Sequence, residues 1–502
     1  MDDRLASIDL GSNTFRLSIG RVVRHDGKAQ IYAEDKLREV VNIASGLDEY
    51  KRLRPEAVAR AIAALERFGE RLKGFPPSNV RAVATNTFRV ARNAAEILPQ
   101  AERALGFPIE IISGQEEARL IFAGVANELP PSDQRRLVID IGGGSTEFII
   151  GQGCKPLRLA SLTIGCTTHT RAYFPHGRIT ESRMRQAILG ARREIEAIAR
   201  PYRHTGWDKA YGSSGTAKGL LAVLTENGLS QRAITLEGME RLRAALIRAG
   251  EVRLQDWAGL KAERAPVLAG GLAIMIAAFQ ELNIDAMGAG EGALRVGVLY
   301  DLLGRDLQHD KRDETVRQFA KRYQVDEAQA ARVSALALAL FDQVGLEAEP
   351  EYEDLRRALA WTASLHECGL AIAHADYHKH SAYILEHADM PGFSRDDQEL
   401  LAFLALGHQG KLGKLRDRSP SRARWLTLCC LRLAVLMHRR REEAAGPLPL
   451  RLHAHGTQLD IAIDRHWLSA HPLSEFTLRA EIEIWRKAGF ELRLTRTAPQ
   501  AA

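Results

Sequence analysis

The sequence predicts an α/β fold built from two related domains, followed by an all-α domain and a small α+β domain. Strand-like and helix-like runs alternate as far as about residue 303. A Gly-rich hairpin occurs twice in this part of the chain. Beyond about residue 308, Ala, Leu, Arg and Glu dominate, and strand signals are absent until Leu450. The predicted domains are therefore 1–121, 122–303, 308–444 and 445–497.

The most informative stretch is residues 137–150, which read LVIDIGGGSTEFII. Two apolar, β-branched runs flank three glycines and two hydroxyls, a pattern that predicts strand, tight loop and strand. We expect the glycines to adopt positive φ, so that backbone N–H groups can surround an anion. Asp140 precedes the loop and Glu147 follows it, and carboxylates are the hard oxygen ligands that a divalent metal needs. A plain hairpin with a flexible turn is the alternative, but it does not account for the two carboxylates.

A second copy of this hairpin lies near the N-terminus, at residues 8–20, with the sequence IDLGSNTFRLSIG. Such a repeat predicts two similar domains that face each other across a cleft. The arrangement resembles the superfamily of actin, sugar kinases and heat-shock chaperone ATPases, whose members hold a polyphosphate and its metal between two such hairpins. The resemblance implies duplicated actin-like (ribonuclease H-like) domains. The ungapped alignment matches Ile8 with Ile139, Asp9 with Asp140, Gly11 with Gly142, Thr14 with Ser145, Ile19 with Ile150 and Gly20 with Gly151.

Two further segments have the composition of phosphate-binding loops. A predicted strand at 80–84 runs into hydroxyl and amide side chains, and Arg89 and Arg92 follow, three apart on a predicted helix. The alternative for these arginines is a solvated helix face. In the second domain, Ser213, Ser214, Gly215 and Thr216 follow another predicted strand. Their equivalent place in the repeat favours a phosphate contact over a simple turn.

Glu117 is the candidate catalytic residue. Ser113 and Glu116 have the spacing of a capping box at a helix start, which gives Glu116 a structural role. Glu117 points about 100° further round the helix. It also follows the end of a predicted strand, the ligand-binding side of α/β folds. From spacing alone, a catalytic and a surface glutamate are equally compatible with this position.

Four motifs occur in the order and approximate spacing of the exopolyphosphatase and guanosine pentaphosphate phosphohydrolase family: residues 9–13, 113–118, 140–147 and 212–216. The chain resembles this family over essentially its whole length, since the longer bacterial members also carry a helical C-terminal half. The resemblance implies a cleft that binds the end of an inorganic polyphosphate chain with Mg²⁺, with K⁺ as a further possible cation, in a homodimer.

By this resemblance and the repeat, Glu117 is the catalytic residue, and Asp9, Asp140 and Glu147 form the metal site. The expected phosphate contacts are Asn13, Thr14, Arg89, Arg92, Gly142, Gly143, Gly144, Ser145, Thr146, Ser213, Ser214, Gly215 and Thr216.

The predicted function is that of an exopolyphosphatase, which releases orthophosphate processively from the end of inorganic polyphosphate. The closest alternative keeps the chemistry and changes the substrate to guanosine pentaphosphate, which would lose its 5′ terminal phosphate. A third possibility is a non-catalytic sensor of polyphosphate or nucleotide.

The helical half contains a histidine cluster around His366, with His374, His378, His380 and His408 nearby in the sequence. It resembles the His-Asp metal phosphohydrolase domain, but Glu367 stands where that family has aspartate. The extra methylene fits a dinuclear metal site poorly. A degenerate domain, with a structural or polyphosphate-contacting role, is therefore favoured over a second active site.

Composition and charge limit the class of protein. The net charge is +6, from 69 basic and 63 acidic residues, and it points only weakly to an anionic partner. Nucleic acid is not an expected partner, because no aromatic side chains interleave with the basic ones. The apolar stretch 265–279 is shorter than a membrane span needs. We expect a cytoplasmic protein, because no signal peptide is visible and the five cysteines form no Cys-x-x-Cys pair.

Overall fold

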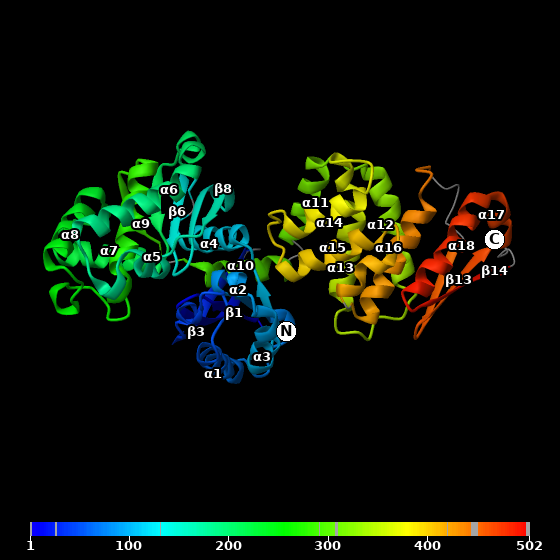
Figure 1. Cartoon of the computed structure of the whole chain (residues 1–502), viewed down its shortest axis with the longest axis horizontal. Helices are drawn as coiled ribbons and strands as arrows, with labels where there is room; N and C mark the ends of the chain where they lie inside the picture. The colour runs from blue at the N-terminus through cyan, green and yellow to red at the C-terminus, as the bar shows by residue number, and fades with distance from the viewer. Residues whose placement is uncertain are drawn as a thin grey trace. The chain divides into compact units, whose positions relative to one another are not determined.

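The computed structural model describes residues 3–25, 28–130, 132–290, 292–306, 310–418, 420–442 and 450–497. The chain divides into two compact units, Met1–Lys311 and Arg312–Ala502 (Figure 1). Each unit is described separately below.

Within the described residues, the first sheet of unit 1 has five strands in the order β3-β2-β1-β4-β5. β1, β2 and β3 are joined as antiparallel neighbours, and β4 and β5 run parallel to β1. The strands are β1 (Arg4–Leu10), β2 (Thr14–His25), β3 (Lys28–Val40), β4 (Val80–Ala84) and β5 (Ile109–Ile111).

The second sheet repeats this topology, since the order β8-β7-β6-β9-β11 corresponds to β3-β2-β1-β4-β5, and β10 adds an antiparallel edge. In the register, Asp9 pairs with Arg16 and Asp140 with Glu147, so Arg16 is the structural counterpart of Glu147. The predicted duplication is confirmed. The strands are β6 (Arg135–Ile141), β7 (Thr146–Gln152), β8 (Lys155–Leu162), β9 (Lys209–Gly212), β10 (Ile234–Thr235) and β11 (Ala286–Ala289).

Helices cover both faces of each sheet in unit 1. Along β6, Leu137 and Ile139 face a core formed with α6 and α9, whereas Val138 faces α4, because neighbouring side chains of a strand point to opposite faces. The helices are α1 (Pro55–Arg71), α2 (Asn86–Val90), α3 (Ala94–Leu105), α4 (Gly114–Glu128), α5 (Cys166–Tyr173), α6 (Glu181–Thr205), α7 (Gly215–Glu226), α8 (Leu236–Ala249), α9 (Leu268–Leu282) and α10 (Leu294–Asp306).

α4 and α10 connect the two halves of unit 1. The two helices lie side by side (Figure 1). They share one buried cluster with Val83 of the first sheet and Val138 of the second. α10 also packs on Leu5 and Val22 of the first sheet. The predicted boundary at 121/122 therefore falls inside α4. Helix α10 was expected to belong to the second domain, but it also packs against the first sheet.

One stretch of the described chain, Ala265–Leu282, is long and apolar enough to cross a membrane by length and composition. It is 72% buried, and its α9 residues form the centre of the second domain's core. A buried core helix of this kind accounts for the composition.

Unit 2 combines the predicted helical and α+β regions around a shared core, which extends from Val333 on α12 to Leu492 on β14. Its sheet has the order β12-β13-β14, with β14 parallel to β13. The elements are α11 (Lys311–Arg322), α12 (Glu327–Phe341), α13 (Tyr352–Leu365), α14 (Tyr377–His387), α15 (Arg395–Gly407), α16 (Arg422–Met437), β12 (Leu450–His455), β13 (Gln458–Asp464), α17 (Arg465–Ala470), α18 (Pro472–Lys487) and β14 (Glu491–Thr497).

Candidate active site

Both Gly-rich hairpins of unit 1 open onto one cavity of about 130 Å³, which we call the carboxylate cavity. It lies where β1, β6 and β9 end, at the carboxyl edge at which α/β folds bind ligands. The predicted site residues that line it are Asp9, Asn13, Thr14, Glu117, Asp140, Gly142, Gly143, Gly144, Ser145, Ser213, Ser214 and Gly215.

The glycine loop between β6 and β7 differs from the prediction in its backbone conformation. Gly142, Gly143 and Gly144 are absent from the positive-φ residues of the described chain, so the expectation of positive φ was wrong. The loop needs glycine for space instead. A Cβ on Gly143 would lie 3.2 Å from the Cβ of Ser12, and one on Gly144 would collide with the Asn86 amide. The glycines therefore let the hairpins of the two domains approach each other.

Gly165 supports the loop from behind, and its replacement is the first prediction. A Cβ at this position would collide with the backbone of Gly143 and Gly144. We expect Gly165→Ala to displace the loop, to lower phosphatase activity and to reduce the free energy of unfolding by about 1–3 kcal/mol. Urea denaturation measures the stability. The control is Gly413→Ala in unit 2, where a Cβ meets open space; equal stability of both variants would contradict close packing at Gly165.

The carboxyl groups of Asp9, Asp140 and Glu147 lie close to the glycine loops, in surroundings that disfavour their ionised forms. Burial, with the Glu117 carboxylate as a further cause, raises the pKa of Asp9 to about 7 and that of Asp140 to about 6. Burial and the same carboxylate also raise the pKa of Glu147. The Ser213 hydroxyl donates to Asp140 Oδ2. Crowded carboxylates of this kind favour a bound cation, which would relieve their repulsion.

Glu147 lies deeper than the other two carboxylates. It is 1% exposed, and Ser161 Oγ donates to its Oε1 at 2.8 Å. Among the described residues, no three His, Cys, Asp or Glu side chains are arranged to hold a metal by themselves. Since Mg²⁺ is commonly bound by one or two carboxylates together with water and substrate phosphates, Asp9 and Asp140 fit this ion. The metal role of the three residues stays a prediction.

The pKa of Asp9 predicts how stability depends on pH in the absence of metal. Because the folded state raises this pKa from 3.8 to about 7, folding is favoured below pH 4, and this contribution is lost as the pH rises through 7. The carboxylate borders the cavity and is partly hydrated, so we expect a loss of roughly 2 kcal/mol. Urea denaturation at pH 5 and pH 8 with EDTA measures it.

Asp9→Asn should flatten this pH dependence, whereas the exposed Asp285→Asn should retain it. Because Asp140 acts in the same direction, a reduced slope remains in Asp9→Asn. An unchanged slope in Asp9→Asn would contradict the raised pKa.

Glu117 is buried at the wall of the cavity, and Arg89 on α2 holds it. Arg89 Nη1 donates to Glu117 Oε2 at 2.7 Å and to the carbonyl oxygen of Ile112 at 3.0 Å. Arg89 thus points to the carboxylate and does not line the cavity. The expectation that Arg92 shares its helix was wrong, because α2 ends at Val90 with Ala91 in an extended conformation, and Arg92 is exposed.

Two predicted phosphate contacts have backbone partners instead. Thr146 Oγ1 donates to the carbonyl of Ile164, and Thr216 Oγ1 donates to that of Ile141. Neither threonine lines the carboxylate cavity. Their hydroxyls hold the two loops in position.

A second cavity of about 440 Å³ shares Arg16, Ser213, Gly215, Arg264 and Ala293 with the first, and we call it the cationic extension. Sequence reasoning missed these arginines, although the repeat placed Arg16 opposite Asp9. No local signal identifies Arg264. The basic side chains that line the extension are Arg16, Lys36, Arg38, Lys218, Lys261, Arg264 and Arg295.

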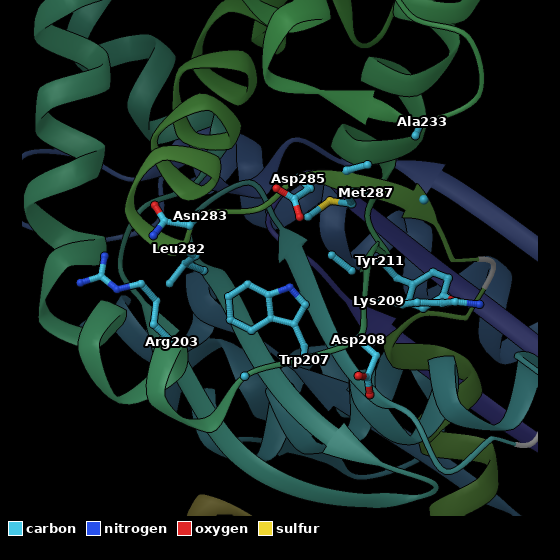
Figure 2. Close-up of a pocket in the computed structure, with 14 residues that line it drawn as sticks. Arg203, Trp207, Asp208, Lys209, Tyr211, Ala233, Leu282, Asn283, Asp285 and Met287 are labelled. Carbon is cyan, nitrogen blue, oxygen red and sulfur yellow. The ribbon is translucent and has the colours of Figure 1, made fainter.

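A larger cavity of about 680 Å³ lies elsewhere in the second domain (Figure 2). Trp207 lies across from Asp285 and Met287 in this view, and Lys209 at the start of β9 is part of the lining. The carboxylate cavity contains Ser213, just beyond the other end of the same strand. The larger cavity therefore lies at the amino edge of the sheet and lacks the predicted catalytic residues.

Three histidines of the cluster in unit 2, His366, His378 and His408, are buried, whereas His374 is exposed and His380 is half-buried. His366 Nδ1 bonds the carbonyl of Ala363 at 2.7 Å, and His408 Nδ1 bonds that of Ala405 at 2.6 Å. Arg441 pairs with Glu367 at 2.5 Å. Burial lowers the pKa of His366, His378 and His408, so the rings are neutral at pH 7. Glu367 is thus engaged by an arginine.

Comparisons with known proteins match most of the chain. The Ppx/GppA phosphatase family matches residues 21–306, and domain III of the Ppx/GppA phosphatases matches residues 311–482. The chain is 39% identical over 497 residues to the guanosine-5′-triphosphate,3′-diphosphate pyrophosphatase of Vibrio cholerae, covering 97% of each chain. It is 39% identical over 498 residues to the protein of that name from Vibrio parahaemolyticus, covering 98% of each.

Solved structures match part of the chain. The Aquifex aeolicus member of the Ppx/GppA family is 26% identical, with a TM-score of 0.51, over 60% of this chain and 98% of the other. An exopolyphosphatase from Cytophaga hutchinsonii is 25% identical, with a TM-score of 0.53, over 60% of this chain and 97% of the other. The predicted actin-like fold is confirmed.

Proposed function

The chain belongs to the Ppx/GppA phosphatase family of phosphoanhydride hydrolases, and we propose that it removes the 5′ terminal phosphate of guanosine 5′-triphosphate 3′-diphosphate. The observation that carries this choice is the 39% identity, over 97% of both chains, to relatives named for that substrate. On the sequence motifs alone, inorganic polyphosphate is the first expectation and the guanosine compound the second. The full-length relatives favour the reverse order.

The cationic extension supports a substrate that carries negative charge beyond the reacting phosphate. It adjoins the carboxylate cavity, and its charged lining consists of seven basic side chains and Glu263, which pairs with Arg38 at 3.1 Å. A nucleotide with phosphate groups at two positions of the ribose could place one group among the carboxylates and the other among these cations. The nearby cations would lower the repulsion between the substrate and the site's own carboxylates.

Asp9 and Asp140 would hold Mg²⁺, with Glu147 behind them. When bound, this ion neutralises charge on the transferred phosphate. The backbone N–H groups of the Gly143 loop and the hydroxyls of Ser145 and Ser213 would orient the terminal phosphate. K⁺ binding and a homodimer remain predictions from the family resemblance, and a cytoplasmic location remains a prediction from the N-terminal sequence and the cysteine pattern.

Glu117 would act as the general base. Its carboxylate accepts a proton from water as the water oxygen attacks the terminal phosphorus. The bond from this phosphorus to the bridging oxygen breaks, and the bridging oxygen keeps the electron pair. Orthophosphate leaves, and the nucleotide retains a diphosphate at each position. Arg89 orients the Glu117 carboxylate through its hydrogen bond to Oε2.

A direct comparison of substrates tests this proposal. We expect kcat/KM with Mg²⁺ to be at least about tenfold higher for the guanosine compound than for polyphosphate chain ends. A ratio reversed in favour of polyphosphate would make the chain an exopolyphosphatase, like its Cytophaga hutchinsonii neighbour by name. If neither substrate releases orthophosphate, the proposal is refuted and the chain is better explained as a non-catalytic sensor.

The cationic extension makes a separate prediction. Lys261 is an exposed lysine in its lining. We expect Lys261→Ala to raise KM about three- to tenfold for the guanosine compound at low salt, with little change in kcat, and the difference to shrink at high salt. The control is Lys73→Ala, an exposed lysine outside both cavities. Equal KM values for the two variants would show that the cationic extension does not take part in substrate binding.

A further inference from the structure

We infer that a buried ion-pair network behind α4, which we call the Asp301 network, positions Glu117 for the reaction. It consists of Arg81, Glu110, Glu116, Arg119 and Asp301. The inference rests on the proposed function, because it assigns positioning residues to the proposed general base.

Arg119 forms the centre of the network on α4. Its Nε and Nη2 atoms each donate to the Glu116 carboxylate at 2.7 Å, and Nη2 also donates to Asp301 on α10. Glu116 is 0% exposed and Arg119 is 8% exposed. The bidentate bonds to Glu116 lie within α4 and fix the direction of the Arg119 guanidinium, and the bond to Asp301 joins the first turn of α4 to α10.

Arg81 on β4 extends the network to the first sheet. Its Nη1 donates to Asp301 Oδ2 at 2.7 Å, and its Nη2 donates to Glu110 on β5 at 2.9 Å. Glu116 Oε1 lies 3.7 Å from the Arg81 Nη2 atom. The network thus connects four elements, β4, β5, α4 and α10, and Asp301 bridges its two arginines.

The network stays charged although it is buried. Burial alone would lower the pKa of Arg81 and Arg119, but the neighbouring carboxylates outweigh this effect, and both pKa values lie above the usual arginine value. Without the Asp301 carboxylate, Arg81 would keep Glu110 and Arg119 would keep Glu116, but both arginines would lose their bond to α10. The arrangement therefore resists rotation of α4.

Glu116 and Glu117 are successive residues of α4 that point in different directions. Glu116 faces the Asp301 network, and Glu117 faces the carboxylate cavity and Arg89. A rotation of α4 that loosened Glu116 would move Glu117 as well, because both are attached to the same turn. The crossing of α4 and α10 adds a second constraint, since a Cβ on Gly297 would collide with the Leu120 carbonyl.

Asp301→Asn tests the inference. We expect kcat for the guanosine compound to fall about 10- to 100-fold, with KM within about threefold of wild type, because misplacement of a catalytic group slows the chemical step. In a Glu117→Gln background, the same substitution should cause no further loss, since the group that it positions is already inactive. This non-additivity separates positioning from a general loss of structure.

The matched control is Glu481→Gln in unit 2, which also removes the carboxylate of a buried ion pair, that with Arg432. We expect lower stability and unchanged kcat. If Asp301→Asn does not fold, Arg119→Lys replaces it, because lysine keeps the charge and loses the fork. The same kcat loss in both backgrounds, or no kcat loss in the wild-type background, would overturn the inference. Unchanged kcat in Glu117→Gln alone would instead refute the proposed role of Glu117.

Discussion

We expect the Glu117→Gln enzyme to hydrolyse guanosine 5′-triphosphate 3′-diphosphate about 10²- to 10⁴-fold more slowly than wild type, the usual contribution of a general base. Glutamine has nearly the same shape and can still accept the hydrogen bond of Arg89, so the cavity should keep its form. It cannot take the proton of the attacking water. Orthophosphate release gives kcat, and equilibrium dialysis of the nucleotide gives Kd.

Binding should be retained or slightly tighter in this variant. Glu117 raises the pKa of Asp9, Asp140 and Glu147, so its removal reduces the negative charge that faces the substrate. The matched control is Glu128→Gln, the same change at the exposed far end of α4. Wild-type kcat in Glu117→Gln would refute its role as the base, and loss of nucleotide binding would make it a binding residue instead.

The second large effect is expected at Asp140. Asp140→Asn removes a carboxylate oxygen from the proposed Mg²⁺ site but keeps a partner for the Ser213 hydroxyl. We expect kcat/KM to fall roughly 10²- to 10³-fold, because charge on the transferred phosphate is then less well neutralised. The Mg²⁺ concentration that gives half-maximal activity should rise by at least about tenfold.

A metal titration of activity provides the measurement, with EDTA as the zero point. Asp285→Asn, at the larger cavity of Figure 2, is the control for loss of an aspartate outside the site. An unchanged Mg²⁺ titration in Asp140→Asn would remove Asp140 from the metal site. Full activity of the wild type in EDTA would remove the metal from the mechanism.

Local patterns predicted the duplicated fold well. Apolar, β-branched runs on both sides of a glycine turn favour a hairpin, and the two copies at Asp9 and Asp140 both form one. The packing of α4 on α10 could not be predicted, because it depends on Gly124 and Gly297, which meet only after the chain has returned to the first sheet. The expectation of positive φ failed because glycine also serves close backbone approach.

The sequence identified those cavity residues that follow or end a predicted strand. Asp9, Glu117, Asp140 and Ser213 all belong to this class, and all line the carboxylate cavity. Arg92 was misplaced because the sequence gives no sign that α2 stops after Val90.

Long-range partners were not predictable. Arg264 reaches the cavity from a loop with no motif, and the bond from Arg89 to Glu117 joins two segments that tertiary folding alone brings together. The motifs also could not predict which substrate is preferred, because both substrates present a terminal phosphoanhydride to the same loops.

A crystal structure of Glu117→Gln with guanosine 5′-triphosphate 3′-diphosphate and Mg²⁺ tests the central claim most directly. We predict the terminal phosphate in the carboxylate cavity, between the Gly143 loop and Asn13, with Mg²⁺ on Asp140 and the second phosphate group among the basic residues around Arg264. Nucleotide bound in the cavity beside Trp207, with the carboxylate cavity empty of phosphate and metal, would contradict the account.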